Sequence, residues 1–179
     1  MSPNARMCLV LSALILAGCG SSVVPISEVG DVPVDNSLVG VWRDLDPESS
    51  AEFLVLKWDE KNYYVELRME PGLPEDEIER FRAYTSVVEG TNFLNLLYLA
   101  ESEEDRLYSF LTYALSSDDT LRIGELNDVA DQNLSDFTSS TDLRAFVRAN
   151  VDNDQFYGPV SLWAKVGDDK QDSSHEQRQ

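Results

Sequence analysis

The chain has 179 residues, with 33 acidic side chains against 14 basic ones and a formal net charge of −19 at pH 7. A chain of this length is enough for one domain with tails. Binding to nucleic acid needs clusters of basic side chains that face the phosphates, so the charge excludes a nucleic-acid partner. The same charge repels anionic lipid head groups, so electrostatic attraction does not hold this protein on a membrane.

The first residues have the parts of a leader for export. Residues 1–6 carry one basic side chain and the amino terminus, and residues 7–16 are apolar apart from Ser12. This apolar run has about half of the roughly 20 residues that a membrane-spanning helix needs. A positive start, a short apolar core and small residues after it are typical of a cleaved secretion signal. We therefore predict a signal peptide over residues 1–18.

Leu16-Ala17-Gly18-Cys19 ends this leader and resembles the lipobox of bacterial lipoproteins at each of its four positions. The resemblance implies that a diacylglycerol is attached to the thiol of Cys19, that the chain is cut before Cys19, and that the new amino group is acylated too. Several acyl chains hold a protein firmly on a membrane, at about 0.8 kcal/mol per buried methylene. An ordinary signal peptide cut nearby, or a cytosolic protein with an apolar start, is the alternative.

The residue after the lipobox bears on which membrane holds the protein. It is Gly20, whereas in the enterobacterial family an Asp at this position keeps lipoproteins at the inner membrane. The resemblance therefore implies a protein anchored in the cell envelope at the outer membrane and facing the periplasm. Because Cys8 falls in the leader and Cys19 carries the lipid, no cysteine remains for a disulfide, and the domain must be stable without one.

Residues 19–37 are predicted to be a lipidated, flexible tether. Gly20, Pro25, Gly30 and Pro33 are spaced through them, and no hydrophobic period is sustained. As a flexible coil, the tether would hold its ends on the order of 25 Å apart. We therefore expect the folded domain to sit off the membrane and to reorient.

Residues 38–167 are predicted to form a mainly β, antiparallel barrel. Residues 63–69 alternate apolar and polar side chains, which is the signature of a half-buried antiparallel strand. Short turns join most of the predicted strands, which favours a meander over a Greek key. Pairing of the last strand with the first would close the sheet and leave no unpaired edges. The eight predicted strands are 38–42, 51–58, 63–69, 81–88, 91–99, 106–115, 120–126 and 160–166.

One amphipathic helix is predicted before the last strand. Residues 139–142 offer side-chain oxygens that can accept the first backbone N–H groups of a helix. We expect the apolar stripe of this helix to cover the open end or the side of the barrel. The stripe consists of Leu143, Phe146, Val147 and Val151.

No catalytic or metal-binding constellation emerges from the sequence. The only histidine, His175, lies in residues 168–179, which lack apolar residues and are predicted to be disordered. Zinc therefore lacks its usual His and Cys ligands. Residues 152–154 (Asp-Asn-Asp) lack the sixth-position glycine and the closing glutamate of an EF-hand, so we interpret them as a helix-terminating turn. We expect no enzyme activity, no cofactor and no metal.

Gly40-Val41-Trp42 lies on the first predicted strand and resembles the Gly-x-Trp motif of lipocalins and smaller lipocalin-like barrels. The resemblance implies that Gly40 permits a close approach and that Trp42 closes the base of the barrel. A plain core tryptophan at a strand start is the alternative. The chain has no Thr-Asp-Tyr turn motif, and its helix precedes the last strand. The chain also resembles the small lipocalin-like domains of bacterial lipoproteins, whose family implies no activity.

Two functional hypotheses follow. In the first, the barrel is a container for a small apolar ligand, because an eight-stranded barrel can hold one. Its candidate lining residues, for each of which core packing is the alternative, are Tyr63, Phe81, Phe93, Tyr108, Phe110 and Tyr113. In the second, the domain is an envelope adaptor with a filled core, and Tyr64, Tyr84 and Tyr98 contribute to an exposed patch. A cavity of a few hundred Å³ would favour the container, and a solid core would exclude it.

Overall fold

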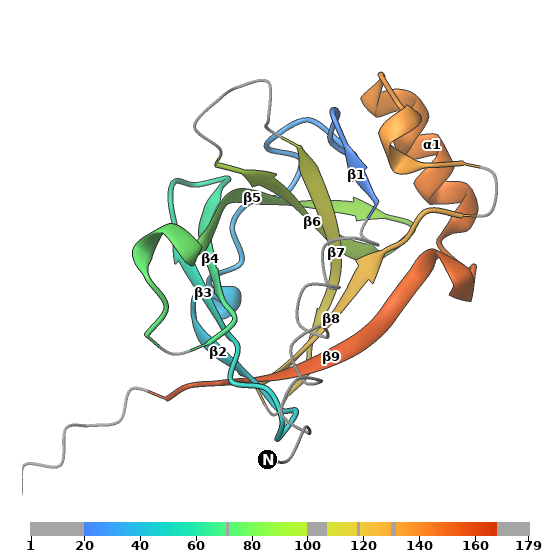
Figure 1. Cartoon of the computed structure of the whole chain (residues 1–179). Coiled ribbons are helices and arrows are strands. Elements are labelled where there is room, and N and C mark those ends of the chain that lie inside the picture. The colour runs from blue at the N-terminus through green and yellow to red at the C-terminus, as the bar shows by residue number, and fades with distance from the viewer. Residues whose placement is uncertain (1–19, 71, 100–106, 118, 130–131, 168–179) are drawn as a thin grey trace, which may run out of the picture.

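The computed structural model describes residues 20–70, 72–99, 107–117, 119–129 and 132–167. Eight antiparallel strands in this part of the chain form a closed barrel (Figure 1), and each is paired with its neighbours in sequence. β9 pairs with both β8 and β2, which closes the sheet as the sequence predicts. The barrel strands are β2 (Gly40–Asp44), β3 (Glu52–Lys57), β4 (Tyr63–Arg68), β5 (Glu79–Val88), β6 (Thr91–Tyr98), β7 (Tyr108–Leu115), β8 (Thr120–Leu126) and β9 (Tyr157–Lys165).

The strand boundaries differ from the prediction mainly at the first and last strands. The first strand begins at Gly40 because Leu38 belongs to a 3₁₀ turn, η1 (Asn36–Leu38), in which the Asp35 side chain accepts the backbone N–H of Ser37. The last strand begins earlier than predicted, at Tyr157, directly after the turn η5 (Asp154–Phe156). Two further short turns are η2 (Glu75–Glu77) and η4 (Leu134–Asp136).

One end of the barrel is closed by η1 and the side chains beneath it. Trp42 is fully buried, and its indole N–H donates to the carbonyl of Leu38 at 2.8 Å. Gly40 has a φ of +146°, and a Cβ at this position would lie 2.7 Å from Cε of Lys165. The Lys165 ammonium in turn lies 5.2 Å from the centroid of the Trp42 ring, which is a cation–π distance. Gly40 therefore permits a close approach at this end, which we call the closed end.

The helix α1 (Ser140–Asn150) lies against the side of the barrel (Figure 1). Ser139 caps it by accepting the backbone N–H of Asp142. Leu143 and Val147 are fully buried, with Phe146 and Val151 partly buried beside them. They form a second core, outside the barrel, together with Ile26, Val88, Phe93, Phe110, Leu126, Leu134 and Phe156.

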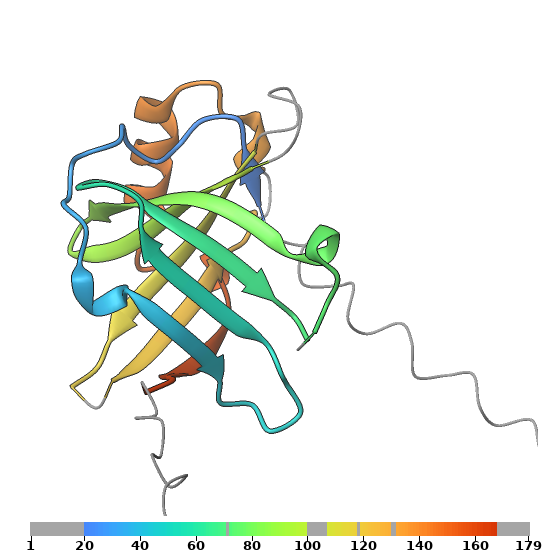
Figure 2. The same cartoon turned by 90° about the vertical axis from the view of Figure 1, so that its left-hand side faces the viewer.

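Residues 20–37, expected as a flexible tether, instead pack along the outer wall of the barrel. They include a short strand, β1 (Ser21–Ser22), which pairs with β7. Ile26 is fully buried in the second core. Figure 2 shows this segment crossing the outside of the barrel on its way to η1. We call residues 20–37 the strap; the predicted anchor Cys19, the leader and the tail 168–179 lie outside the described residues.

A buried polar network fastens the strap to the outer face of β5 and β6. Asn95, which is fully buried, accepts the backbone N–H of Ile26 at 2.9 Å and donates to Ser86 Oγ at 2.7 Å. The hydroxyl of Tyr84 donates to the carbonyl of Ser27 at 2.8 Å. These partners are far apart in sequence, so hydrophobic periodicity does not detect them. Buried polar groups are costly unless they are paired, so this network specifies where the strap lies.

Replacing Asn95 tests whether the buried polar network holds the strap on the barrel wall. Asn95→Ala leaves the N–H of Ile26 and the hydroxyl of Ser86 without this partner, so the free energy of unfolding should fall by about 1–3 kcal/mol. Urea denaturation measures the change, and Asn36→Ala, at an exposed position, is the matched control. A loss no larger than that of the control would mean that residues 20–37 do not depend on this network.

Candidate functional site

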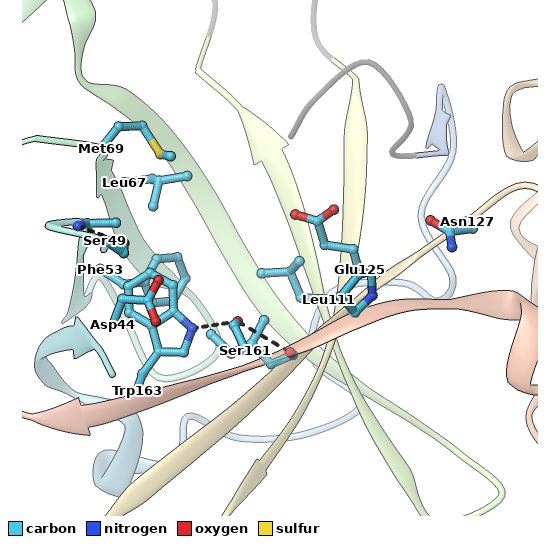
Figure 3. Close-up of a pocket in the computed structure, with 13 residues that line it drawn as sticks. Asp44, Ser49, Phe53, Leu67, Met69, Leu111, Glu125, Asn127, Ser161 and Trp163 are labelled. Carbon is cyan, nitrogen blue, oxygen red and sulfur yellow. Dashed lines mark hydrogen bonds between the residues drawn. The ribbon is translucent and has the colours of Figure 1, made fainter. Parts of the chain in front are cut away.

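A cavity of about 440 Å³ occupies the barrel at the end opposite η1 (Figure 3). This end, which we call the mouth, is where β2, β4 and β8 finish and where β3 and β9 start. The lining side chains come from six of the barrel strands and from the loops that follow β2, β4 and β8. They are Asp44, Ser49, Ala51, Phe53, Leu67, Met69, Leu111, Ile123, Glu125, Asn127, Pro159, Ser161 and Trp163.

The inner part of the cavity is apolar. The rings of Phe53 and Trp163 contact each other, with centroids 6.0 Å apart and planes tilted by 51°. The Trp163 indole N–H donates to Ser161 Oγ at 2.7 Å, and that hydroxyl can donate to the carbonyl of Ile123 at 3.4 Å (Figure 3). Because these polar groups bond to one another, an apolar molecule could contact this wall without leaving them unpaired.

The charged side chains among the described lining residues are both acids, Asp44 and Glu125. Asp44 comes from β2 and Glu125 from β8, and β9 lies between these two strands. Asp44 also accepts the backbone N–H of Asp46 at 3.0 Å. Carboxylates accept hydrogen bonds and attract positive charge. The site therefore combines an apolar interior with two carboxylates at the mouth.

The six aromatic residues predicted to line a cavity lie elsewhere. Tyr63, Phe81 and Tyr113 belong to the packed interior of the barrel and do not border the cavity. Phe93, Tyr108 and Phe110 point outward into the second core. The cavity instead uses Phe53 and Trp163, which lie near the mouth. Alternation assigns side chains to a face of a strand, but it does not say which end of the barrel is left unfilled.

The predicted patch of Tyr64, Tyr84 and Tyr98 does not form. Tyr84 is buried under the strap. Tyr98 is directly opposite Phe81, a member of the barrel interior, so it shares that inner face rather than the outer wall. Its ring lies 5.7 Å from that of Phe81, whereas the ring of Tyr64 packs 6.1 Å from Trp58.

Glu79 introduces an ionisable group at the inner face of β5. It lies two residues before Phe81, on the same face of the strand. Its register partner on β4 is Leu67, which lines the cavity. Its Oε2 atom is buried and makes no hydrogen bond to the described residues. Burial raises the pKa of the Glu79 carboxyl above its ordinary value of 4.5.

This raised pKa makes a prediction about stability. The folded state binds the Glu79 proton more tightly than the unfolded state, so this group destabilises the fold as pH rises from about 4.5 through the folded-state pKa. Glu79→Gln should therefore melt at a higher temperature than the parent at pH 7.5, and the difference should vanish at pH 3.5. Melting curves at both pH values measure it, with the exposed Glu48→Gln as the control. An equal effect at both pH values would contradict the assignment.

Residues 152–154 follow α1 and lead into η5, with the Asn153 side chain accepting the N–H of Gln155 at 3.1 Å; they are the predicted turn. Within the described ranges, no three His, Cys, Asp or Glu side chains gather as a metal site. Nor does this part of the chain contain a helix long and apolar enough to cross a membrane.

No protein-family model, curated protein or solved structure matches the chain. The functional assignment therefore rests on the cavity and on the lipobox-like sequence of residues 16–19.

Proposed function

We propose that this protein is a lipid-anchored, non-enzymatic binding protein of the bacterial cell envelope that holds a small apolar ligand in its barrel. The observation that carries the proposal is the apolar cavity of about 440 Å³ at the mouth. Its volume falls within the roughly 300–1,000 Å³ typical of small-molecule sites. A domain acting only through its surface has no need for such a cavity. The absence of the predicted tyrosine patch also favours binding over the adaptor alternative.

The resemblance of Gly40-Val41-Trp42 to the Gly-x-Trp motif supports the same proposal. At the closed end, Gly40 lies close to Lys165, and the indole of Trp42 is hydrogen-bonded. The anchor is proposed from the sequence Leu16-Ala17-Gly18-Cys19, and the outer membrane from Gly20.

The two carboxylates at the mouth, Asp44 and Glu125, discriminate among the head groups that a ligand can carry. The described lining side chains bring two carboxylates and no Lys, Arg or His, and the whole chain has a net charge of −19. A ligand with a carboxylate head group would meet negative charge at the mouth. A hydroxyl or an ammonium group would instead find hydrogen-bond acceptors. The ligand class supported best is an apolar molecule with an uncharged or positively charged end.

Binding can be measured with three molecules of one chain length. Decanol and decylamine should bind the purified domain, and decanoate at least about tenfold more weakly, a difference of about 1.4 kcal/mol. Calorimetry below the micellar concentrations gives the affinities. Leu67→Trp, which fills the cavity, should abolish binding.

The matched control for this substitution is Leu56→Trp, because Leu56 is exposed on the outer wall of β3. If none of the three molecules binds, the container proposal is wrong. Binding that survives Leu67→Trp unchanged would place the ligand outside this cavity.

The lipid anchor is tested separately. Cys19→Ala should release the protein from the membrane fraction, since no thiol remains in the mature chain to carry the acyl chains. Cys8→Ala, in the leader, is the matched control and should leave fractionation unchanged. Intact-mass measurement of the control should show the acylated chain beginning at Cys19. An unmodified amino end or a retained leader would refute the anchor.

A further inference from the structure

The described chain begins beside the mouth of the cavity. The backbone N–H of Gly20 donates to the carbonyl of Leu126 at 3.3 Å. Leu126 lies between Glu125 and Asn127, both of which line the cavity. Gly20 is buried, and a Cβ on it would lie 2.5 Å from Leu134 Cδ1. The backbone at Gly20 is thus held closely against the outer side of the rim.

The strap pairs with the barrel directly after Gly20. Ser21 and Ser22 are already paired with Ser109 and Tyr108 of β7. Cys19, the predicted point of lipid attachment, directly precedes Gly20 in the sequence. A flexible tether would let the barrel turn freely over its anchor. Because the strap packs on the wall from Gly20 onward, no such flexible tether separates Gly20 from the barrel.

The outer wall next to the mouth carries exposed apolar side chains. Leu45, Val160 and Leu162 expose 50%, 53% and 43% of their surface. They line one shallow hollow together with Pro47 and Pro159, and Asp44, Asp46 and Ser161 also border it. This hollow shares Asp44, Pro159 and Ser161 with the cavity, so the two are adjacent. We call these five apolar residues the apolar rim. Contiguous apolar surface of this kind usually marks a contact with a partner or a membrane.

We propose that the mouth and the apolar rim rest on the lipid bilayer, so that a ligand passes between the membrane and the cavity without crossing water. This inference depends on the lipid anchor at Cys19 in the proposed function. An anchor attached at the rim brings that end of the barrel to the membrane, and the apolar rim supplies the contact. The chain's net charge of −19 disfavours anionic lipids, so the surface that fits is one of zwitterionic phospholipid.

The opposite end of the barrel then points away from the membrane. Figure 2 shows η1 toward the left-hand end, whereas β1 and the loop between β2 and β3 lie toward the right. The turn between β3 and β4 is also at the closed end, because the backbone N–H of Val34 in the strap donates to the carbonyl of Glu60 in this turn at 3.1 Å. These two loops provide matched positions for a probe.

The test uses the full chain, acylated in cells and reconstituted into phosphatidylcholine vesicles that carry a nitroxide quencher on some head groups. The mature chain has no cysteine other than Cys19, so one introduced cysteine can be labelled with a fluorophore alone. Glu48→Cys, in the loop between β2 and β3, reports on the mouth. Glu60→Cys, at the closed end, is the matched control because both positions are exposed and lose the same charge.

Quenching should be at least threefold stronger for the label at position 48 than for the label at position 60. Equal quenching, or stronger quenching at position 60, would overturn the proposed orientation while leaving the anchor and the cavity in place. A chain that intact mass shows to be unacylated, and that does not bind the vesicles, would instead refute the anchor of the proposed function, and the orientation with it.

The apolar rim is tested by a second variant. Val160→Ser combined with Leu162→Ser, in the Glu48→Cys background, should reduce quenching at position 48 toward the level seen at position 60. Leu56→Ser, on an outer-wall position nearer the closed end, is the control and should leave quenching at position 48 unchanged. Quenching that is unaffected by the rim variant would show that the anchor alone sets the orientation, and the proposed rim contact would be wrong.

Discussion

Pairing of β9 with β2 is the constraint on which the rest of the structure depends. It turns a meander of strands into a ring without free edges, and closure separates an inner face from an outer face on every strand. The inner face is filled from the closed end, where Trp42, Tyr63 and Leu38 are buried. The packing does not extend to the mouth, where the cavity lies. Without closure these side chains would have no common interior to fill or to leave open.

The outer face is organised by two segments that do not belong to the ring. The helix α1 covers one part of the wall and the strap another, and both contribute to the second core. The two segments use different chemistry. Leu143 and Val147 are held by apolar contact, whereas Ile26 also depends on the amide of Asn95. The strap therefore has one specified position on the wall, which apolar packing alone would not determine.

Much of the fold could be predicted from the sequence because its signals are local. Alternation in residues 63–69 predicts a strand, and the spacing of Leu143 and Val147 predicts a helix, since each pattern needs only neighbouring residues. The strap could not be predicted in this way. Its stability comes from partners such as Tyr84 and Asn95, more than fifty residues away, and its glycines and prolines are typical of loops.

The sequence predicts a barrel with room for a ligand, but it does not identify the residues that line the cavity. A barrel of eight strands suggests an interior that can hold a ligand, but the lining depends on how far the core extends along the axis. Phe93 and Leu94 illustrate the difficulty: both are apolar and buried, yet Phe93 faces the second core and Leu94 faces the barrel interior. A mostly apolar strand does not reveal which of its two faces lies inside.

The described chain begins and ends at opposite ends of the barrel. Gly20 is held near the mouth, whereas β9 finishes at Lys165, whose ammonium donates to the carbonyl of Ser37 in η1 at 3.0 Å. A tension applied between these two points would load the strap first, and β1 of the strap has only two residues, Ser21 and Ser22, paired with β7. Once the strap had come away, the tension would act on the start of β2 and the end of β9, which lie side by side at the closed end, so the hydrogen bonds between these two strands would open one after another.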